Sequence, residues 1–123
     1  VIIGSREMVG SVRDEEPWYR HVMGRGFNIM VQILAIPGIL DTQCGFKLFS
    51  KQAVADIFPQ VTLGRWAFDI EVLALAKAKG YALHEFPVKW TNDDRSHVKL
   101  ADYLQVLMDT VRIRWRLWTG FYN

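Results

Sequence analysis

The sequence has little cysteine, no long uncharged segment and no large excess of one charge, and each absence excludes a class of protein. Its single cysteine, Cys44, cannot form an internal disulfide, which is typical of proteins in a reducing compartment. The longest run without a charged side chain, residues 26–40, has 15 residues. A membrane-spanning helix needs roughly 20, so no such helix is expected within the chain. A formal net charge of +2 does not indicate nucleic-acid binding.

Motifs for several common chemistries are also missing. One cysteine and three scattered histidines do not have the spacing of a zinc site. Residues 24–26 are too short for a Gly-rich phosphate loop, and no nucleophile-elbow pattern is present. Half of the residues are hydrophobic, which is enough for a packed core in one domain. Arginines and carboxylates remain as the side chains to consider for chemistry.

The hydrophobic pattern alternates between strand and helix periods. It predicts strands at residues 1–3, 46–49 and 81–90, and helices at residues 18–36, 51–58, 67–79 and 100–118. Residues 6–17 and 91–97 have no periodicity and are predicted to be loops, and Pro87 is expected to place its strand at a sheet edge or a bulge. This order predicts a mixed α/β fold with a mixed sheet and flanking helices.

Two arginines have surroundings that suit phosphate. Arg6 follows the first strand, and Arg25 lies between two glycines near the start of a long helix. A guanidinium group matches phosphate oxygens geometrically, and glycines allow close approach. Ordinary surface arginines would give the same pattern, so both interpretations stay open.

Carboxylates follow in two polar stretches. Asp41 lies between a helix and a strand, where it could act as a general base or could cap its own turn. Asp69 and Glu71 begin a helix, where acidic side chains favour the positive helix end. They do not share a helical face, which argues against a paired acid–base device.

The last helix combines an apolar stripe with basic and aromatic side chains. Residues 112–123 contain three arginines and no acidic residue. Helices at a membrane interface place arginines against lipid phosphates and tryptophans at headgroup depth. A core-packing helix with a solvated basic face is the alternative. The predicted interface residues are Arg112, Arg114, Trp115, Arg116 and Trp118.

Residues 41–49 (DTQCGFKLF) and 65–71 (RWAFDIE) resemble the dolichyl-phosphate β-glucosyltransferase and dolichol-phosphate mannosyltransferase group of family 2 glycosyltransferases. Residues 2–6, 87–90 and 113–115 agree in the same order, so the resemblance covers essentially the whole chain. It implies part of a GT-A fold, the nucleotide-diphospho-sugar transferase fold. We expect residues 1–98 to be the acceptor-side half of its catalytic domain and residues 99–123 to be an amphipathic membrane-interface helix.

The resemblance implies an inverting enzyme that transfers a sugar from a nucleotide diphosphate to a polyprenyl or dolichyl phosphate, with UDP-glucose favoured over GDP-mannose. Arg6 and Arg25 match residues expected to bind the acceptor phosphate, and Asp41 matches an aspartate near the reacting centre. Supporting contacts are expected from Gln43, Asp69, Glu71, Ser96 and His97. A histidine at position 97, where relatives often have lysine, would bind phosphate only when protonated.

The chain begins with a strand pattern and no methionine, so we expect a fragment of a longer protein that is inactive alone. The family's Asp-x-Asp motif, which binds Mg²⁺ or Mn²⁺, and the nucleotide-sugar half are expected upstream of residue 1. Membrane association on the cytosolic face is expected. Two alternatives stay open: a non-catalytic lipid-surface binding module, and a related transferase with a soluble glycan acceptor.

Overall fold

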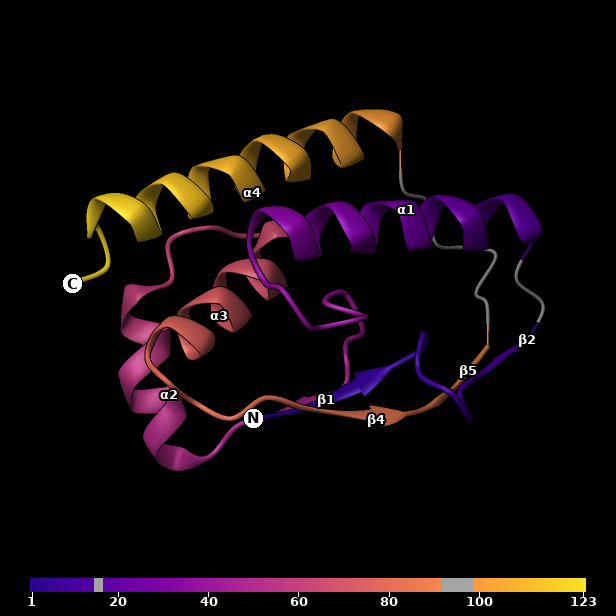
Figure 1. Ribbon diagram of the computed structural model, residues 1–123, viewed down its shortest axis with the longest axis horizontal. Helices are drawn as coiled ribbons and strands as arrows, with labels where there is room; N and C mark the ends of the chain where they lie inside the picture. The colour runs from indigo at the N-terminus through magenta and orange to yellow at the C-terminus, as the bar shows by residue number, and fades with distance from the viewer. Residues whose placement is uncertain (15–16, 92–98) are drawn as a thin grey trace.

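The computed structural model describes residues 1–14, 17–91 and 99–123 (Figure 1). Its elements in chain order are β1 (Ile2–Ser5), β2 (Val12–Asp14), α1 (Trp18–Leu34), β3 (Lys47–Leu48), α2 (Lys51–Ile57), a 3-10 turn η1 (Phe58–Gln60), α3 (Ala67–Ala78), β4 (His84–Pro87), β5 (Lys89–Thr91) and α4 (Leu100–Thr119). The fold is mixed α/β, a small mixed sheet with flanking helices, as the sequence predicted, and it is consistent with part of a GT-A fold.

β1 is the centre of the main sheet. It pairs with β3 in antiparallel and with β4 in parallel orientation, which leaves β4 and its Pro87 at an edge, as predicted. The close packing of β1 depends on Gly4, where a Cβ atom would lie only 2.9 Å from Val88 Cγ1 and 3.2 Å from Cys44 Sγ.

Two predictions about the strands need correction. Residues 6–17 were predicted to be a loop but contain β2, and the strand predicted at residues 81–90 is divided into β4 and β5. The division has a physical reason, because the two halves have different partners: β4 pairs with β1, whereas β5 pairs in parallel with β2. The pairing partner lies far away in sequence, so local periodicity does not reveal it.

Helix α3 is the centre of the helical layer. Residues 70–76 are all buried, so the helix is covered on every side rather than along one stripe. One core cluster joins it to β1, α1 and α4, and a second joins it to α2 and Tyr122. Gly80, with φ +83°, ends the helix region as the sequence predicted, and Ser50 caps α2 by accepting a hydrogen bond from the Ala53 amide.

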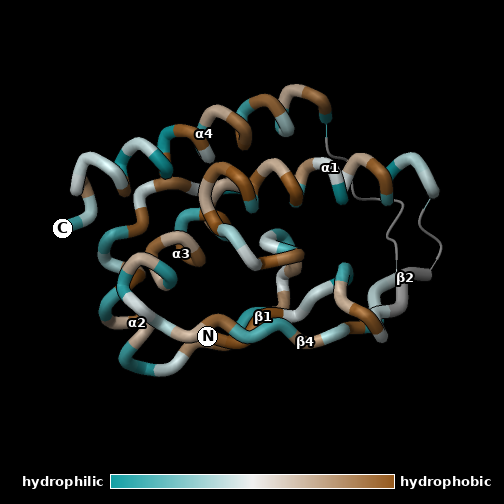
Figure 2. Tube along the Cα trace, viewed as in Figure 1, coloured by the Kyte–Doolittle hydropathy of each residue, from teal (hydrophilic) through white to brown (hydrophobic). Residues whose placement is uncertain are grey.

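Helices α1 and α4 run side by side in the same direction and form the layer farthest from the sheet (Figure 1). The rings of Phe27 and Tyr103 meet edge-to-face between them, with centroids 5.6 Å apart. Hydrophobic residues recur along both helices (Figure 2), and several of their apolar side chains are exposed. On α1 these are Trp18, Tyr19, Val22, Met23, Ile29 and Ile33, and on α4 they are Leu100, Leu104, Met108, Val111, Trp115 and Trp118. No helix within residues 1–14, 17–91 and 99–123 is long and apolar enough to cross a membrane.

Candidate functional site

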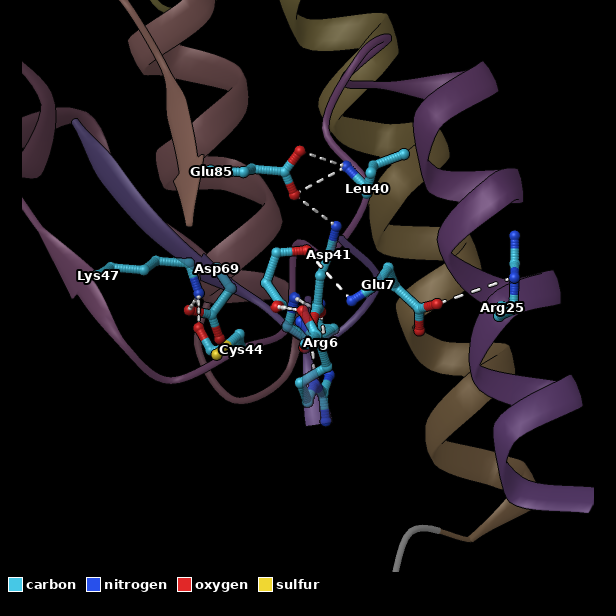
Figure 3. Close-up of polar contacts among 12 residues, drawn as sticks. Arg6, Glu7, Arg25, Leu40, Asp41, Cys44, Lys47, Asp69 and Glu85 are labelled. Atoms are coloured by element: carbon cyan, nitrogen blue, oxygen red, sulfur yellow. Dashed lines mark hydrogen bonds and ion pairs between the residues drawn. The ribbon is translucent and has the colours of Figure 1, made fainter. Parts of the chain in front are cut away.

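Arg6 and Asp41, both predicted site residues, form the centre of a polar cluster (Figure 3). Arg6 directly follows β1, at the carboxyl end that β1 shares with its parallel neighbour β4. Its Nε donates to Asp41 Oδ2 at 2.7 Å, and its Nη2 donates to Oδ1 at 3.0 Å. Such a two-pronged pair fixes the plane of the guanidinium group.

Asp41 is fully buried, and its carboxylate is held by further donors. The backbone N–H of Arg6 donates to Oδ2 at 3.0 Å, and that of Gln43 donates to Oδ1 at 3.2 Å. Burial alone would raise the pKa of Asp41, but the hydrogen bonds and charge of Arg6 outweigh it and hold that pKa below its ordinary value of 3.8. A carboxylate with a lowered pKa is a weak base, so this geometry favours orientation of Arg6 over proton removal. The prediction that Asp41 takes part in the reaction itself stays a prediction.

Side chains from the two neighbouring strands complete the support of Arg6 and Asp41. The guanidinium carbon of Arg6 lies over the Trp90 ring on β5, 5.3 Å from the ring centroid. On β4, the Glu85 carboxylate accepts hydrogen bonds from the backbone N–H groups of Leu40 and Asp41, each at 3.0 Å. The cluster is therefore assembled from the end of β1, the loop after α1, β4 and β5.

Arg25 reaches the same region from α1. Its Nε lies 3.8 Å from Glu7 Oε2, and Glu7 is the residue after Arg6 (Figure 3). The Arg25 side chain is 62% exposed, whereas that of Glu7 is 7% exposed. Through Glu7, the structure thus brings the exposed Arg25 side chain near the cluster of Arg6 and Asp41.

Gln43 and Asp69 lie on the flank of the cluster, near the start of α3. The Gln43 side chain donates to the Trp66 carbonyl at 3.2 Å, while its Oε1 is buried and has no hydrogen-bond partner among the described residues. Asp69 accepts from Lys47 Nζ at 2.6 Å, and the Lys47 side chain is almost completely buried. Asp69 is therefore more than a helix-start charge, because it ties α3 to β3.

Glu71 lies elsewhere and has another role. It is fully buried and accepts from Thr62 Oγ1, from the backbone N–H groups of Thr62 and Leu63, and from Tyr122 Oη at 2.6 Å. The structure therefore does not place Glu71 in the Arg6–Asp41 cluster. It joins α3 to the loop before it and to the chain after α4.

The predicted interface residues of α4 divide into two groups. Arg112, Arg114, Trp115 and Trp118 are exposed. Arg116 differs from the prediction: its side chain is only 19% exposed, it donates to Thr62 Oγ1 at 2.6 Å and it lies 3.7 Å from Glu71 Oε1. Its position on the helix turns it toward Glu71, a partner that helical spacing alone does not reveal.

Sequence reasoning missed Glu85, Glu7 and Lys47. Glu85 had one visible signal, because it is the only carboxylate in the strand predicted at residues 81–90. Lys47 lies within residues 41–49, one of the stretches that carry the family resemblance, whereas Glu7 had no signal beyond its charge. Ser96 and His97 lie outside the described residues, so their predicted contacts are not addressed by the structure.

Nowhere within residues 1–14, 17–91 and 99–123 do three or more His, Cys, Asp or Glu side chains gather where they could hold a metal ion. These residues therefore offer no cluster of ligands for the divalent cation that the resemblance implies.

Comparison with known proteins gives a consistent answer. The chain is 38% identical over 126 aligned residues to a dolichyl-phosphate beta-glucosyltransferase of Dictyostelium discoideum and, over the same length, 38% identical to that of Saccharomyces cerevisiae. Each alignment covers 100% of the chain and 38% of the relative. A human protein of the same name is 37% identical over 110 residues, which are 89% of the chain and 34% of that protein.

These similarities confirm the resemblance inferred from the sequence, along the whole chain. The chain spans little more than a third of the length of these curated relatives. No protein-family model matches it, and no solved structure matches it.

Proposed function

We propose that this chain, similar over its whole length to dolichyl-phosphate β-glucosyltransferases, is the acceptor-side part of a longer enzyme that transfers glucose to dolichyl phosphate. The donor is a nucleotide-diphosphate glucose, and transfer inverts the anomeric centre. The observation that carries the proposal is the whole-chain similarity to several proteins of that one name.

The chemistry asks little of a general base. A phosphate monoester is already ionised near neutral pH, so the acceptor oxygen can attack the sugar without losing a proton. The protein's task is to hold the phosphate in line and to balance its charge. This agrees with a site in which the pKa of Asp41 is lowered and its carboxylate orients a guanidinium group.

Arg6 and Arg25 are the proposed phosphate-binding residues. Asp41 and Trp90 hold the Arg6 guanidinium group in place, which reduces the entropy lost when phosphate binds. Arg25 is 62% exposed, and its ion pair with Glu7, at 3.8 Å, is longer than a hydrogen bond, so its side chain can move toward an incoming anion. The two cations approach one region from β1 and from α1.

The divalent cation expected for the full enzyme stays a prediction, with its ligands expected outside this chain. When bound, it would balance charge on the nucleotide diphosphate. No step assigned to the residues above depends on it.

We also propose that α1 and α4 contact the cytosolic surface of a membrane. The two helices carry twelve apolar side chains that are each at least 48% exposed, and clustered exposed apolar side chains mark a surface that contacts a partner or a membrane. Arg112 and Arg114 are exposed beside Trp115 and Trp118, the combination expected at lipid headgroups. A lipid-linked acceptor would reach the Arg6 region from that surface.

The phosphate site is tested in the longer protein by Arg6→Ala and Arg25→Ala. Both are expected to lose glucose transfer to dolichyl phosphate while nucleotide-sugar binding stays nearly intact. Lys51→Ala is the control, because it removes an exposed cation from α2, away from the site. Normal turnover in both arginine variants would exclude the phosphate site.

Membrane contact is tested by flotation with vesicles of neutral and anionic phospholipid. Trp115→Ser with Trp118→Ser should reduce binding to both vesicle types, and Arg112→Gln with Arg114→Gln should reduce binding to the anionic ones only. Arg116 is kept, because it holds Glu71. Unchanged flotation of both double variants would contradict the proposed surface.

A further inference from the structure

We infer that Glu85 is a positioning residue for the acceptor-phosphate site, holding Asp41 so that Asp41 can hold Arg6. The inference rests on the proposed function and extends it to a residue outside the stretches that carry the family resemblance. Three groups form a chain of contacts: a carboxylate on β4, a carboxylate in the loop after α1, and the guanidinium group after β1 (Figure 3).

The first link joins a strand to a loop. Glu85 is opposite Ile3 in the β1–β4 ladder, so its backbone position is fixed by the centre of the sheet. Both of its carboxylate oxygens accept from the Leu40 N–H, and Oε1 also accepts from the Asp41 N–H, all at 3.0 Å. Hydrogen bonds to a charged acceptor are stronger than those between neutral groups.

The loop has little other regular structure to fix it. Residues 35–46 lie between α1 and β3, and they include a turn at Gly38 with φ +95°. Backbone N–H groups outside helices and sheets need partners of their own. The backbone N–H groups of Leu40 and Asp41 both donate to Glu85, which lies 45 and 44 positions further along the chain.

The second link transmits this placement to Arg6. Asp41 is fully buried and contacts Nε and Nη2 of Arg6 with a defined orientation. A shift of the Asp41 backbone would therefore move or rotate the guanidinium group. Because transfer requires the phosphate to be aligned with the sugar, small displacements of Arg6 should weaken acceptor binding and turnover.

The test uses Glu85→Gln in the longer protein. The glutamine has the same shape, but it is neutral and one of its two terminal atoms is a donor that faces the backbone N–H groups. We expect the acceptor KM to rise roughly tenfold through loss of charge-assisted hydrogen bonds. The nucleotide-sugar Kd should stay within about twofold, which also shows that the variant is folded.

A double variant separates positioning from a general effect on stability. If Glu85 acts through Asp41, Glu85→Gln combined with Asp41→Asn should raise the acceptor KM no more than Asp41→Asn alone does. Independent effects would multiply instead. Asp56→Asn is the matched control, because Asp56 also accepts hydrogen bonds, from Gln52 and Tyr81, but lies on α2. It should leave the acceptor KM unchanged.

The outcomes distinguish this inference from the proposed function. If Arg6→Ala abolishes transfer but Glu85→Gln has a normal acceptor KM, or if the two effects multiply, the role of Glu85 is overturned and the phosphate site stands. If Arg6→Ala itself leaves the acceptor KM unchanged, the phosphate site fails, and the role of Glu85 fails with it.

Discussion

Asp41 and Glu71 are both fully buried carboxylates, and each has an arginine close to it, yet they serve different regions of the molecule. Asp41 contacts its arginine directly at 2.7 Å, and that arginine lies at the carboxyl end of the central strand. Glu71 lies 3.7 Å from Arg116, and its strongest contacts are neutral groups of the loop before α3 and of Tyr122.

These contacts separate a buried charge with a functional role from one with a structural role. A carboxylate that accepts hydrogen bonds only from backbone N–H groups and hydroxyls, as Glu71 does among the described residues, holds the fold together. A carboxylate that also accepts two hydrogen bonds from a partly exposed guanidinium group, as Asp41 does, holds that group ready for a ligand. We therefore expect changes at Glu71 to act mainly on stability and changes at Asp41 mainly on activity.

Glu71→Ala should have the largest effect on folding. It would leave the Thr62 and Leu63 N–H groups, the Tyr122 hydroxyl and the Arg116 charge without their buried acceptor. Loss of one partner from such a network costs about 3–5 kcal/mol of unfolding free energy. Denaturant unfolding of the longer protein measures it, and a loss below about 0.5 kcal/mol would contradict the structural role, because that is the range of ordinary surface substitutions.

Asp41→Asn should have the next largest effect, and on activity. The amide keeps the shape but removes the charge that fixes Arg6, so glucose transfer is expected to fall roughly a hundredfold. The fall should be seen in the acceptor KM and kcat, with nucleotide-sugar binding unaffected. If transfer stayed normal while the protein became much less stable, Asp41 would belong with Glu71 as a structural group.

Tyr122→Phe should have a smaller effect in the Glu71 region. It removes only the hydroxyl that donates to Glu71 at 2.6 Å and keeps the ring in place. A lost hydrogen bond to a charged acceptor lowers the unfolding free energy by about 1.5–3 kcal/mol. Thermal unfolding would detect the change, and transfer activity measured well below the unfolding temperature should be unaltered.

The last prediction concerns how stability depends on pH, and its effects are smallest at neutral pH. It separates the region of Asp41 from the region of Glu71 and Tyr122. The folded-state pKa of Asp41 is lowered, so its contribution to stability is complete above its unfolded value of 3.8 and is lost as the pH falls through the folded value. Burial and the Glu71 hydrogen bond raise the pKa of Tyr122 from 10.0 to about 12, so its contribution is complete below pH 10 and is lost as the pH rises toward 12.

Unfolding measured across pH should therefore show Asp41→Asn removing part of the acid dependence and Tyr122→Phe removing part of the alkaline dependence. If Asp41→Asn instead changed the alkaline dependence and Tyr122→Phe the acid dependence, the roles given to the two residues would be wrong.

The sequence correctly predicted the features that depend on residues close together in the chain. The four helices, the cap at Ser50, the left-handed Gly80 just after α3 and the edge position of Pro87 all follow from nearby residues, and all are present. β2 and the division of β4 from β5 were missed, because both result from pairing between distant segments.

The same distinction applies to the site. Arg6 and Asp41 were expected from the residue types and the family resemblance, and the structure places them in contact. Glu85 and the inward turn of Arg116 depend on which elements pack together, so they required the fold. Charge and spacing alone predicted that Asp69 and Glu71 both stabilise the start of a helix. In the structure Asp69 pairs with Lys47 on β3, whereas Glu71 binds the loop before α3 and Tyr122.

The crowding around Gly4 has a practical consequence for measuring local motion. The chain's only thiol, Cys44, is buried against β1 with 7% of its surface exposed, so a reagent should reach it mainly when that packing opens. The rate at which Cys44 reacts with a thiol-specific label would therefore give the frequency of opening beside Arg6 without any engineered probe. Comparing that rate with and without dolichyl phosphate would show whether the acceptor holds the strand closed.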